Sequence, residues 1–283
     1  MHLIQSAADM RAFSNQCFLE GRSIGFVPTM GALHSGHISL LSKAASENDV
    51  TVCSIFVNPA QFNNREDLLK YPRTPESDLK MLEAAGCTAV WMPQPADMYP
   101  HKPATGFTFG PIENVLEGTH RPGHFAGVGL VLSKFFNLLQ PCSCYMGLKD
   151  LQQFLVVKQM VEELNFNIRL IGCPTVREED GLAMSSRNVR LSASHRAQAP
   201  VLYRELVKAA SAIKNGTQAK TACHLAIAAI ESDSDGKVEY FEAAAMPDLQ
   251  PLNSLPEKEE IALLLAVFYG DIRLIDNIIV ELN

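Results

Sequence analysis

Short apolar runs alternate with amphipathic stretches along the first half of the chain. Residues 23–28 form an apolar run, and a glycine-containing turn separates it from residues 37–47, where apolar side chains recur on one helical face. Residues 50–57 follow as an almost entirely apolar run rich in β-branched side chains. Strands that are apolar on both faces are typical of a parallel sheet covered by helices on both sides. The pattern therefore predicts a strand, a helix and a second parallel strand.

The same alternation continues to about residue 176. Thr74 and Pro75 are residue types that begin helices, and Gly86 is suited to end one. The elements predicted next are a strand at 87–92, a helix at 125–140, a strand at 142–146, a helix at 151–164 and a strand at 168–176. These repeated units predict an α/β fold with a Rossmann-like, doubly wound parallel sheet over residues 1–176.

The remaining residues, 177–283, follow a different order. After a charged loop come two predicted helices, at 194–214 and 217–232, and then three predicted strands, at 237–243, 261–268 and 273–280. Helices followed by a run of strands indicate a smaller α+β domain. We therefore place the domain boundary after Val176.

Charge and hydropathy limit the partners of this chain. Its 24 Lys and Arg against 31 Asp and Glu give a formal net charge of −7. That balance disfavours broad attraction to nucleic acids or anionic membranes but leaves room for a local cationic pocket. The uncharged stretch at 261–269 is about half of the roughly 20 residues that a membrane-spanning helix needs. Because Asp9 and Arg11 interrupt the first residues, we predict no secretory signal and expect a cytoplasmic protein.

Seven cysteines are scattered among apolar or amphipathic segments. This usage indicates reduced, buried thiols. Cys142 and Cys144 form the single close pair, and their spacing directs both side chains to one face of a strand, unlike a C-x-x-C redox or zinc motif. We therefore predict buried thiols and not a metal site. Cys53 has no base partner in the linear pattern, so we predict that it is not a thiol nucleophile.

Residues 28–37, between the first predicted strand and its helix, carry the most informative chemistry. A helix N-terminus offers N–H groups and positive potential to a phosphate, and Gly31 and Gly36 permit close approach of the backbone. The spacing of His34 and His37 places both on one side of the first helical turn, where each can donate to a polyphosphate oxygen. The alternative is a glycine-containing turn with two exposed histidines. Zinc binding is disfavoured because the segment lacks the H-E-x-x-H pattern.

Three other polar segments occupy positions where ligands bind in an open α/β sheet or at the domain boundary. Asn58 and Gln61 follow the second predicted strand, although such residues also make ordinary polar turns. Lys149 and Asp150 begin a predicted helix, where the alternative is a solvated pair. Residues 184–187 supply two hydroxyls and a guanidinium that can surround triphosphate oxygens, and the alternative is a serine that caps a helix.

Taken in order, these segments resemble a known family. The Gly-x-x-His-x-Gly-His stretch that ends at His37 is similar to the HIGH-type signature of the nucleotidylyl transferase superfamily. One departure is Leu148, which stands where a polar residue is usual and concerns local packing. The chain resembles the pantoate–β-alanine ligase family nearly from end to end, on residues 28–37, 56–62, 121–128, 149–153, 174–188 and 273–277.

The resemblance implies an ATP-dependent amide synthesis in two steps. The carboxylate of D-pantoate attacks the α-phosphorus of ATP, forming pantoyl adenylate and pyrophosphate. The amine of β-alanine then attacks the acyl carbon, giving pantothenate and AMP. ATP enters as a substrate with Mg²⁺ on its phosphates. The resemblance also implies a homodimer, an ATP- and pantoate-binding domain at 1–176 and a lid domain at 177–283.

Site residues follow from the same resemblance. It implies catalytic roles for His34, His37 and Lys149, and contacts of Gln61 and Gln153 with pantoate, Gln61 also lying at the β-alanine position. The implied ATP contacts are Met30, Gly31, Ala32, Leu33, His34, Ser35, Gly36, His37, Gly147, Leu148, Lys149, Asp150, Val176, Met184, Ser185, Ser186 and Arg187.

Other functions stay open on the histidine motif alone. One is a nucleotidyl transferase that acts on a phosphorylated substrate, which the neutral Gln61 and Gln153 disfavour because a phosphate needs additional cations. Another is a nucleotide sensor without turnover. A tRNA-charging enzyme is disfavoured by the acidic net charge. Arg121 and His124 fit either a site or a surface corner, and His101 and His120 are predicted to be surface residues.

Overall fold

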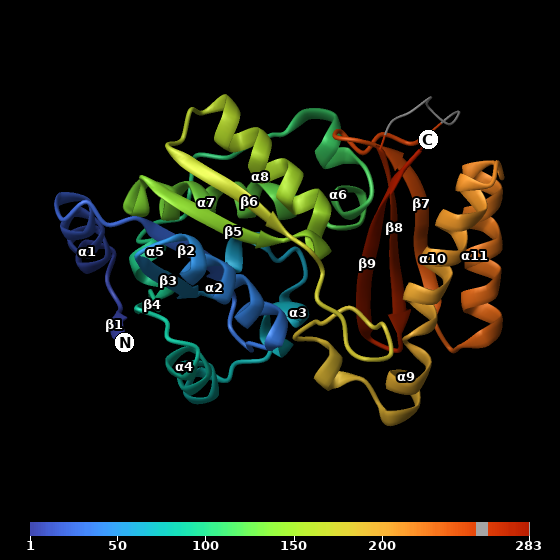
Figure 1. Cartoon of the computed structure of the whole chain (residues 1–283), viewed down its shortest axis with the longest axis horizontal. Coiled ribbons are helices and arrows are strands. Elements are labelled where there is room, and N and C mark those ends of the chain that lie inside the picture. Colours follow the sequence, from blue (N-terminus) through green and yellow to red (C-terminus); the bar gives the residue numbers. More distant parts are fainter. Residues whose placement is uncertain (253–259, 283) are drawn as a thin grey trace. The chain divides into compact units, whose positions relative to one another are not determined.

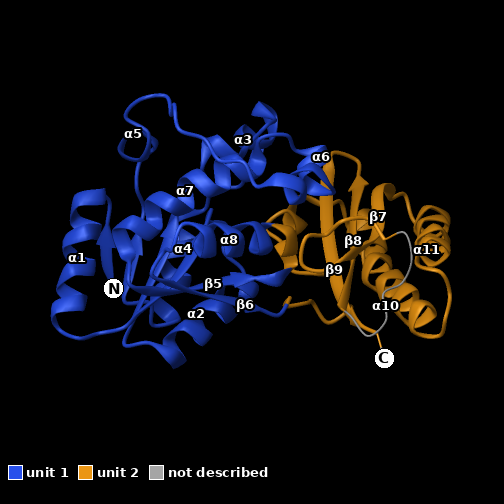
Figure 2. Cartoon of the chain, turned by 90° about the horizontal axis from the view of Figure 1, so that it is seen from above, with its two compact units in different colours: residues 1–148, 153–174 blue, residues 149–152, 175–283 orange. Residues whose placement is uncertain are grey.

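The computed structural model describes residues 1–252 and 260–282. The chain forms two compact units (Figure 2). The first contains Met1–Leu148 and Gln153–Pro174, and the second contains Lys149–Gln152 and Thr175–Asn283. The first unit thus ends at Pro174, where the sequence pattern suggested Val176, and the short segment from Lys149 to Gln152 belongs with the second unit.

A six-stranded sheet forms the centre of the first unit (Figure 1). Its order is β1-β4-β3-β2-β5-β6, and every neighbouring pair runs parallel. The predicted doubly wound parallel sheet is therefore confirmed. The strands are β1 (His2–Ile4), β2 (Ile24–Thr29), β3 (Val50–Ile55), β4 (Ala89–Trp91), β5 (Cys142–Gly147) and β6 (Ile168–Cys173).

The central strands β2, β3 and β4 are buried on both faces, which explains why they are largely apolar. Successive side chains of a strand point to opposite faces. Val27 packs in a cluster with Leu41 of one helix and Leu82 of another. The neighbouring Phe26 instead contacts Phe135 edge to face, with ring centroids 5.7 Å apart. Neighbouring residues of β2 thus find apolar partners on opposite faces of the sheet.

Helices cover the sheet and connect its strands. Four of them were not predicted, because their apolar periodicity is weak or their length is a single turn or two: α1 (Ala7–Leu19), α3 (Arg65–Lys70), α5 (Pro95–Met98) and α6 (Glu117–His120). The helices of this part of the chain are α1 (Ala7–Leu19), α2 (Ser35–Glu47), α3 (Arg65–Lys70), α4 (Pro75–Ala84), α5 (Pro95–Met98), α6 (Glu117–His120), α7 (His124–Leu139) and α8 (Leu151–Glu163), with 3-10 turns η1 (Pro59–Gln61), η2 (Gly110–Asn114) and η3 (Leu148–Asp150).

The second unit is an α+β arrangement around a three-stranded antiparallel sheet of order β7-β8-β9. The predicted helix at 194–214 is wrong in one respect, because it is divided before Pro200, whose ring lacks the N–H needed inside a helix. The elements of the second unit are η4 (Asn188–Arg190), α9 (Ala193–Gln198), α10 (Val201–Lys214), α11 (Ala219–Asp233), β7 (Lys237–Ala245), β8 (Glu260–Tyr269) and β9 (Ile272–Glu281).

All seven cysteines are free and buried, as predicted. Burial raises the pKa of the Cys142 thiol to about 12 and that of Cys223 to about 11. Cys53 is fully enclosed, and burial raises its pKa well above the ordinary value. These thiols are packing groups, because a nucleophilic cysteine needs the thiolate form. Across residues 1–252 and 260–282, none of the helices has the length and hydrophobicity to cross a bilayer.

Candidate active site

The loop between β2 and α2 has an unusual backbone. Gly31 and Ala32 both have left-handed conformations, with φ of +81° and +50°. The Asp78 carboxylate of α4 accepts the N–H of Ala32 at 2.9 Å through Oδ2 and the N–H of Leu33 at 2.8 Å through Oδ1. At the start of the loop, the Thr29 hydroxyl donates to the Ser54 carbonyl at 2.6 Å. The loop is therefore tied both to the neighbouring strand β3 and to α4.

His34 and His37 lie together at the beginning of α2. Their ring centroids are 4.0 Å apart, and both residues are half-buried. The sequence prediction that the two rings share one side of the first turn is confirmed, and the alternative of two fully exposed histidines is wrong. The backbone N–H of His34 donates to Nδ1 of His37 at 3.3 Å. Nδ1 is thus an acceptor, and the neutral imidazole of His37 carries its proton on Nε2, where it can donate to an anion.

Gln61 belongs to a buried polar cluster after β3. Asn58 donates to Oε1 of Gln61 at 3.0 Å and to the Gly127 carbonyl at 3.1 Å. The Tyr99 hydroxyl donates to Oδ1 of Asn58 at 2.8 Å. Burial raises the pKa of Tyr99 to about 12, so this phenol remains a donor at neutral pH. These contacts orient the Gln61 amide group so that Nε2 lies 3.2 Å from Sδ of Met30.

Two residues of this cluster have clear structural roles that the sequence left open or did not indicate. The ring of His124 is buried, and its Nδ1 lies 2.9 Å from the Gln61 carbonyl oxygen. His124 therefore does not belong to a turn on the protein surface. Gly127 lets α7 approach η1 closely, because a Cβ there would come within 2.2 Å of the Ala60 carbonyl oxygen. Tyr99 carried no sequence signal, because it lies outside every recognised motif.

The other predicted pantoate contact, Gln153, lies half-buried in the first turns of α8 and belongs to the first unit. Among the described residues, no hydrogen bond joins it to Gln61. Leu148 also has a visible packing role, because a Cβ added at Gly172 of β6 would come within 2.8 Å of the Leu148 side chain. A leucine at this position therefore makes an apolar contact across two neighbouring strand ends.

In the second unit, Lys149 is paired with its neighbour Asp150, Nζ and Oδ2 being 3.2 Å apart. The Lys149 side chain is 19% exposed and that of Asp150 is 45% exposed, so one partner of the pair is largely covered and the other is open to solvent. The Asn277 amide donates to the Lys149 carbonyl oxygen at 2.7 Å. Strand β9 thereby fixes the backbone of Lys149.

A buried ion pair adjoins this contact. Arg177 donates to both oxygens of Asp276, at 2.6 and 3.0 Å, and its guanidinium lies 3.7 Å from the centre of the Tyr203 ring. Asp276 is 4% exposed. Burial raises the pKa of its carboxyl, and the bond from Arg177 opposes that rise. Asp276 therefore depends on Arg177 for its charged form.

The segment at 184–187 follows a short hairpin in the second unit. The N–H of Met184 donates to the Val176 carbonyl at 3.0 Å, and Arg177 and Ala183 form an antiparallel bridge. Ser185 accepts the N–H of Arg187 at 3.2 Å, which makes a local turn. The alternative is a polar loop before a helix with Ser185 or Ser186 as its cap, and the structure shows that the serine capping α9 is Ser192.

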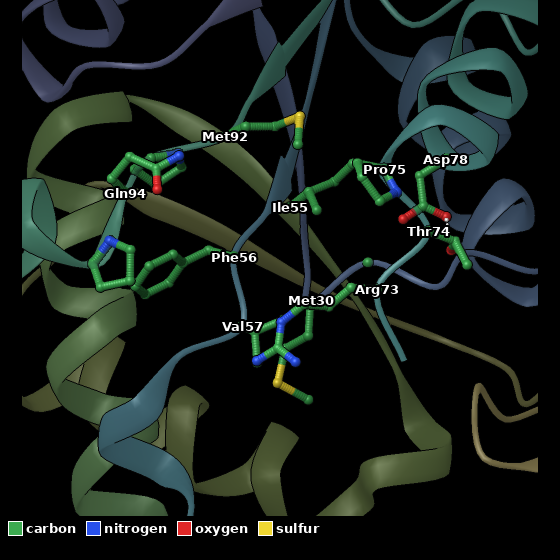
Figure 3. Close-up of a pocket in the computed structure, with 13 residues that line it drawn as sticks. Met30, Ile55, Phe56, Val57, Arg73, Thr74, Pro75, Asp78, Met92 and Gln94 are labelled. Atoms are coloured by element: carbon green, nitrogen blue, oxygen red, sulfur yellow. Dashed lines mark hydrogen bonds between the residues drawn. The ribbon is translucent and has the colours of Figure 1, made fainter. Parts of the chain in front are cut away.

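A cavity of about 250 Å³ opens at the carboxyl ends of β2, β3 and β4 (Figure 3). In Figure 3, Asp78 and Thr74 lie on one side of the cavity, and Met92 and Gln94 lie on another. Ligands of open α/β sheets bind at this edge. The cavity adjoins the histidine loop through Met30 and Gly31 without including His34, His37 or Gln61.

No metal-binding group of three or more His, Cys, Asp or Glu side chains occurs within residues 1–252 and 260–282. His101 and His120 are exposed, as predicted for surface residues.

Comparison with known proteins decides the family. The model of the family described as pantoate-beta-alanine ligase matches residues 2–279. The chain belongs to the pantoate–β-alanine ligase family. The predicted family, fold and enzyme class are thereby confirmed.

Relatives of the pantoate–β-alanine ligase family match over nearly their whole length. A pantothenate synthetase of Cytophaga hutchinsonii is 46% identical over 264 residues, covering 93% of each chain. One of Acetivibrio thermocellus is 45% identical over 282 residues, covering 99% of this chain and all of the relative.

Solved structures agree with the sequence comparison. Pantothenate synthetase from Thermus thermophilus has a TM-score of 0.90 and 40% identity, covering 98% of this chain and 99% of that one. Pantoate-beta-alanine ligase from Francisella tularensis, complexed with beta-gamma ATP and beta-alanine, has a TM-score of 0.84 and 35% identity, covering 98% and 97%. The fold described above is thus that of the family.

Proposed function

We propose that this chain condenses D-pantoate with β-alanine to give pantothenate, using ATP and releasing AMP and pyrophosphate. The family match over residues 2–279 carries the proposal. The Francisella tularensis relative, whose structure contains an ATP compound and β-alanine, supports the choice of these two substrates. Homodimer formation and a cytoplasmic location remain predictions.

In the first step, a carboxylate oxygen of pantoate bonds to the α-phosphorus as the bond to the pyrophosphate oxygen breaks. A carboxylate is ionised at neutral pH, so this step needs positioning and charge stabilisation and not a general base. We propose that His34 and His37 contact the phosphates. The geometry of His37, whose Nε2 carries the proton in the neutral ring, suits donation to a phosphate oxygen.

The second unit supplies the other proposed phosphate contacts. Lys149 and Arg187 are cations, and Ser185 and Ser186 are hydroxyl donors. Asp150 and Gly147 are proposed to contact the ribose, and the Val176 backbone the adenine. Mg²⁺ is expected as part of the MgATP substrate, bound to phosphate oxygens. A lid role for residues 177–283 is likewise a prediction.

In the second step, the neutral amine of β-alanine attacks the acyl carbon, the bond to AMP breaks, and the nitrogen loses one proton as the amide forms. Gln61 and Gln153 are the proposed pantoate contacts, and Gln61 also borders the β-alanine position. A primary amide suits a hydroxy acid because it both donates and accepts. The cluster of Asn58 and Tyr99 supports this role, since it orients Gln61 before a substrate binds.

The assay measures pyrophosphate from the protein, ATP and D-pantoate, and then pantothenate and AMP after β-alanine is added. We expect one equivalent of pyrophosphate before β-alanine and continuous turnover after it. A nucleotide conjugate as product would identify a different nucleotidyl transferase, and ATP binding without pyrophosphate release would identify a sensor. Either result would reject the proposal.

His37→Ala should slow single-turnover formation of pantoyl adenylate by about 100-fold or more, because it removes a donor to a developing charge. The matched control is His101→Ala, which changes an exposed histidine outside the site. Equal adenylation rates for His37→Ala and His101→Ala would rule out the role of His37.

A further inference from the structure

Asp78 lies outside the set of residues proposed to touch substrates, yet it is a buried group bound closely to the histidine loop. It sits in the first turn of α4 and is 2% exposed. Its two carboxylate oxygens accept the backbone N–H groups of Ala32 and Leu33, at 2.9 and 2.8 Å. The Thr74 hydroxyl donates to Oδ1 at 3.1 Å. The carboxylate is thus held by α4 and holds the loop in turn.

The loop needs such a partner because of its backbone conformation. Gly31 and Ala32 are consecutive left-handed residues. Alanine is disfavoured in this region by contact of its Cβ with the following carbonyl. Successive N–H groups in such a stretch form a concavity that attracts an anion. In this protein a side chain of the same chain supplies the anion.

The loop backbone at Gly31 passes close to the Asp78 carboxylate. A Cβ built at Gly31 would lie 3.0 Å from Oδ2 of Asp78 and 3.0 Å from Cγ2 of Ile55. Asp78 also borders the 250 Å³ cavity, with Thr74 beside it (Figure 3). The position of Asp78 therefore fixes where the loop runs between β2 and the first turn of α2.

We propose that Asp78 is a positioning residue for adenylate formation. Its carboxylate fixes the backbone of Ala32 and Leu33 and thereby places the imidazoles of His34 and His37, which follow in the chain, where they can contact the ATP phosphates. The inference rests on the proposed function, because it assigns the histidines to ATP. It also means that the N–H groups of Ala32 and Leu33 bind Asp78, while the imidazoles bind phosphate. A displacement of about 1 Å at such a group can cost about 100-fold in rate.

The test variant is Asp78→Asn, which keeps the shape but replaces one acceptor oxygen by an NH₂ group that faces a backbone N–H. We expect the single-turnover rate of pantoyl adenylate formation at saturating ATP and pantoate to fall by about tenfold or more. Exchange of the Ala32 and Leu33 amide hydrogens, followed by NMR, should accelerate at the same time. A merely structural contribution to folding would change the melting temperature without this local acceleration.

Asp49→Asn is the matched control. Asp49 accepts the N–H and hydroxyl of Ser23 at 2.9 and 2.7 Å, so it makes the same kind of contact between β2 and β3, at the amino ends of the strands. Its adenylation rate should stay within about twofold of the unmodified chain, because it lies away from the histidine loop.

The outcomes separate this inference from the proposed function. An unmodified chain that forms no pantoyl adenylate would reject the function. An active unmodified chain together with an Asp78→Asn variant of normal adenylation rate would overturn the positioning role. If Asp78→Asn does not fold, Thr74→Val decides, because it removes only the hydroxyl donor at an exposed residue. Faster Leu33 exchange with slower adenylation supports the inference, and no change in either overturns it.

Discussion

Two segments proposed to bind ATP phosphates are anchored by different chemistry. In the first unit, the histidine loop is held by Asp78, a carboxylate that accepts two backbone N–H groups. In the second unit, Lys149 is held through its carbonyl by Asn277, next to the buried ion pair of Arg177 and Asp276. The first anchor holds a loop with two consecutive left-handed residues, whereas the second holds a backbone carbonyl through the amide of a strand residue.

The difference teaches how damage to each anchor should appear. Removing the Asp78 carboxylate releases the loop that carries His34 and His37, so we expect the loss to appear in the adenylation rate. Removing Asp276 leaves a buried guanidinium without its partner, which mainly costs folding free energy.

The largest expected effect on stability belongs to Asp276→Asn. It breaks the buried ion pair and should lower the free energy of unfolding by about 3 to 5 kcal/mol, measured by urea denaturation. The control in the same unit is Asp271→Asn, which breaks the pair between Asp271 and Arg190. The Asp271 side chain is 68% exposed. That change should cost less than about 1 kcal/mol. Equal costs for the two variants would contradict the larger contribution expected of the buried pair.

A smaller effect is expected from Asn277→Ala. It removes the 2.7 Å bond from the amide to the half-buried Lys149 carbonyl, and loss of one such hydrogen bond costs about 1 kcal/mol. If Lys149 contacts ATP, the Michaelis constant for ATP should rise while that for pantoate stays unchanged. Urea denaturation and steady-state kinetics measure the two effects. An unchanged free energy of unfolding together with an unchanged Michaelis constant for ATP would contradict the proposed role of Asn277 in holding Lys149.

The smallest effect concerns acid pH and Asp180. The bond from Arg196 lowers the pKa of this carboxyl from its ordinary value of 3.8. A lowered folded-state pKa means stability that is present above about pH 3.8 and is lost as pH falls through the folded value. Asp180→Asn should therefore lower the melting temperature slightly at neutral pH, and the difference should shrink below pH 3.8. A difference that grows with acidity would contradict this sign.

Asp276 should behave in the opposite way, which sharpens the contrast between surface and buried carboxylates. Burial raises its pKa, so the folded protein binds the proton more readily than the unfolded chain. Protonation of Asp276 therefore contributes most to stability below pH 3.8, the ordinary pKa of the carboxyl. That contribution is lost as the pH rises from 3.8 through the raised pKa of the folded protein.

Much of the fold followed from the apolar pattern. The central strands β2, β3 and β5 and the helices α2 and α7 lie close to the predicted ranges, because strands buried on both faces are continuously apolar. β1 escaped prediction because it is short and its Leu3 is half exposed. Pro200 divides a helix that periodicity alone continued. The pairing of His34 and His37 followed from helical spacing, which is a local property.

The sequence by itself determined the parallel sheet, the family and the local placement of the two histidines, since each depends on residues close together in the chain or on an ordered set of motifs. Only the tertiary structure revealed the anchors. Asp78 meets Leu33 across 45 residues, and Asn277 meets Lys149 across 128. Such contacts join side chains to backbone groups that every residue carries, so no residue type at either end signals the pairing. The folded sheets bring these groups together, and burial then makes their hydrogen bonds obligatory.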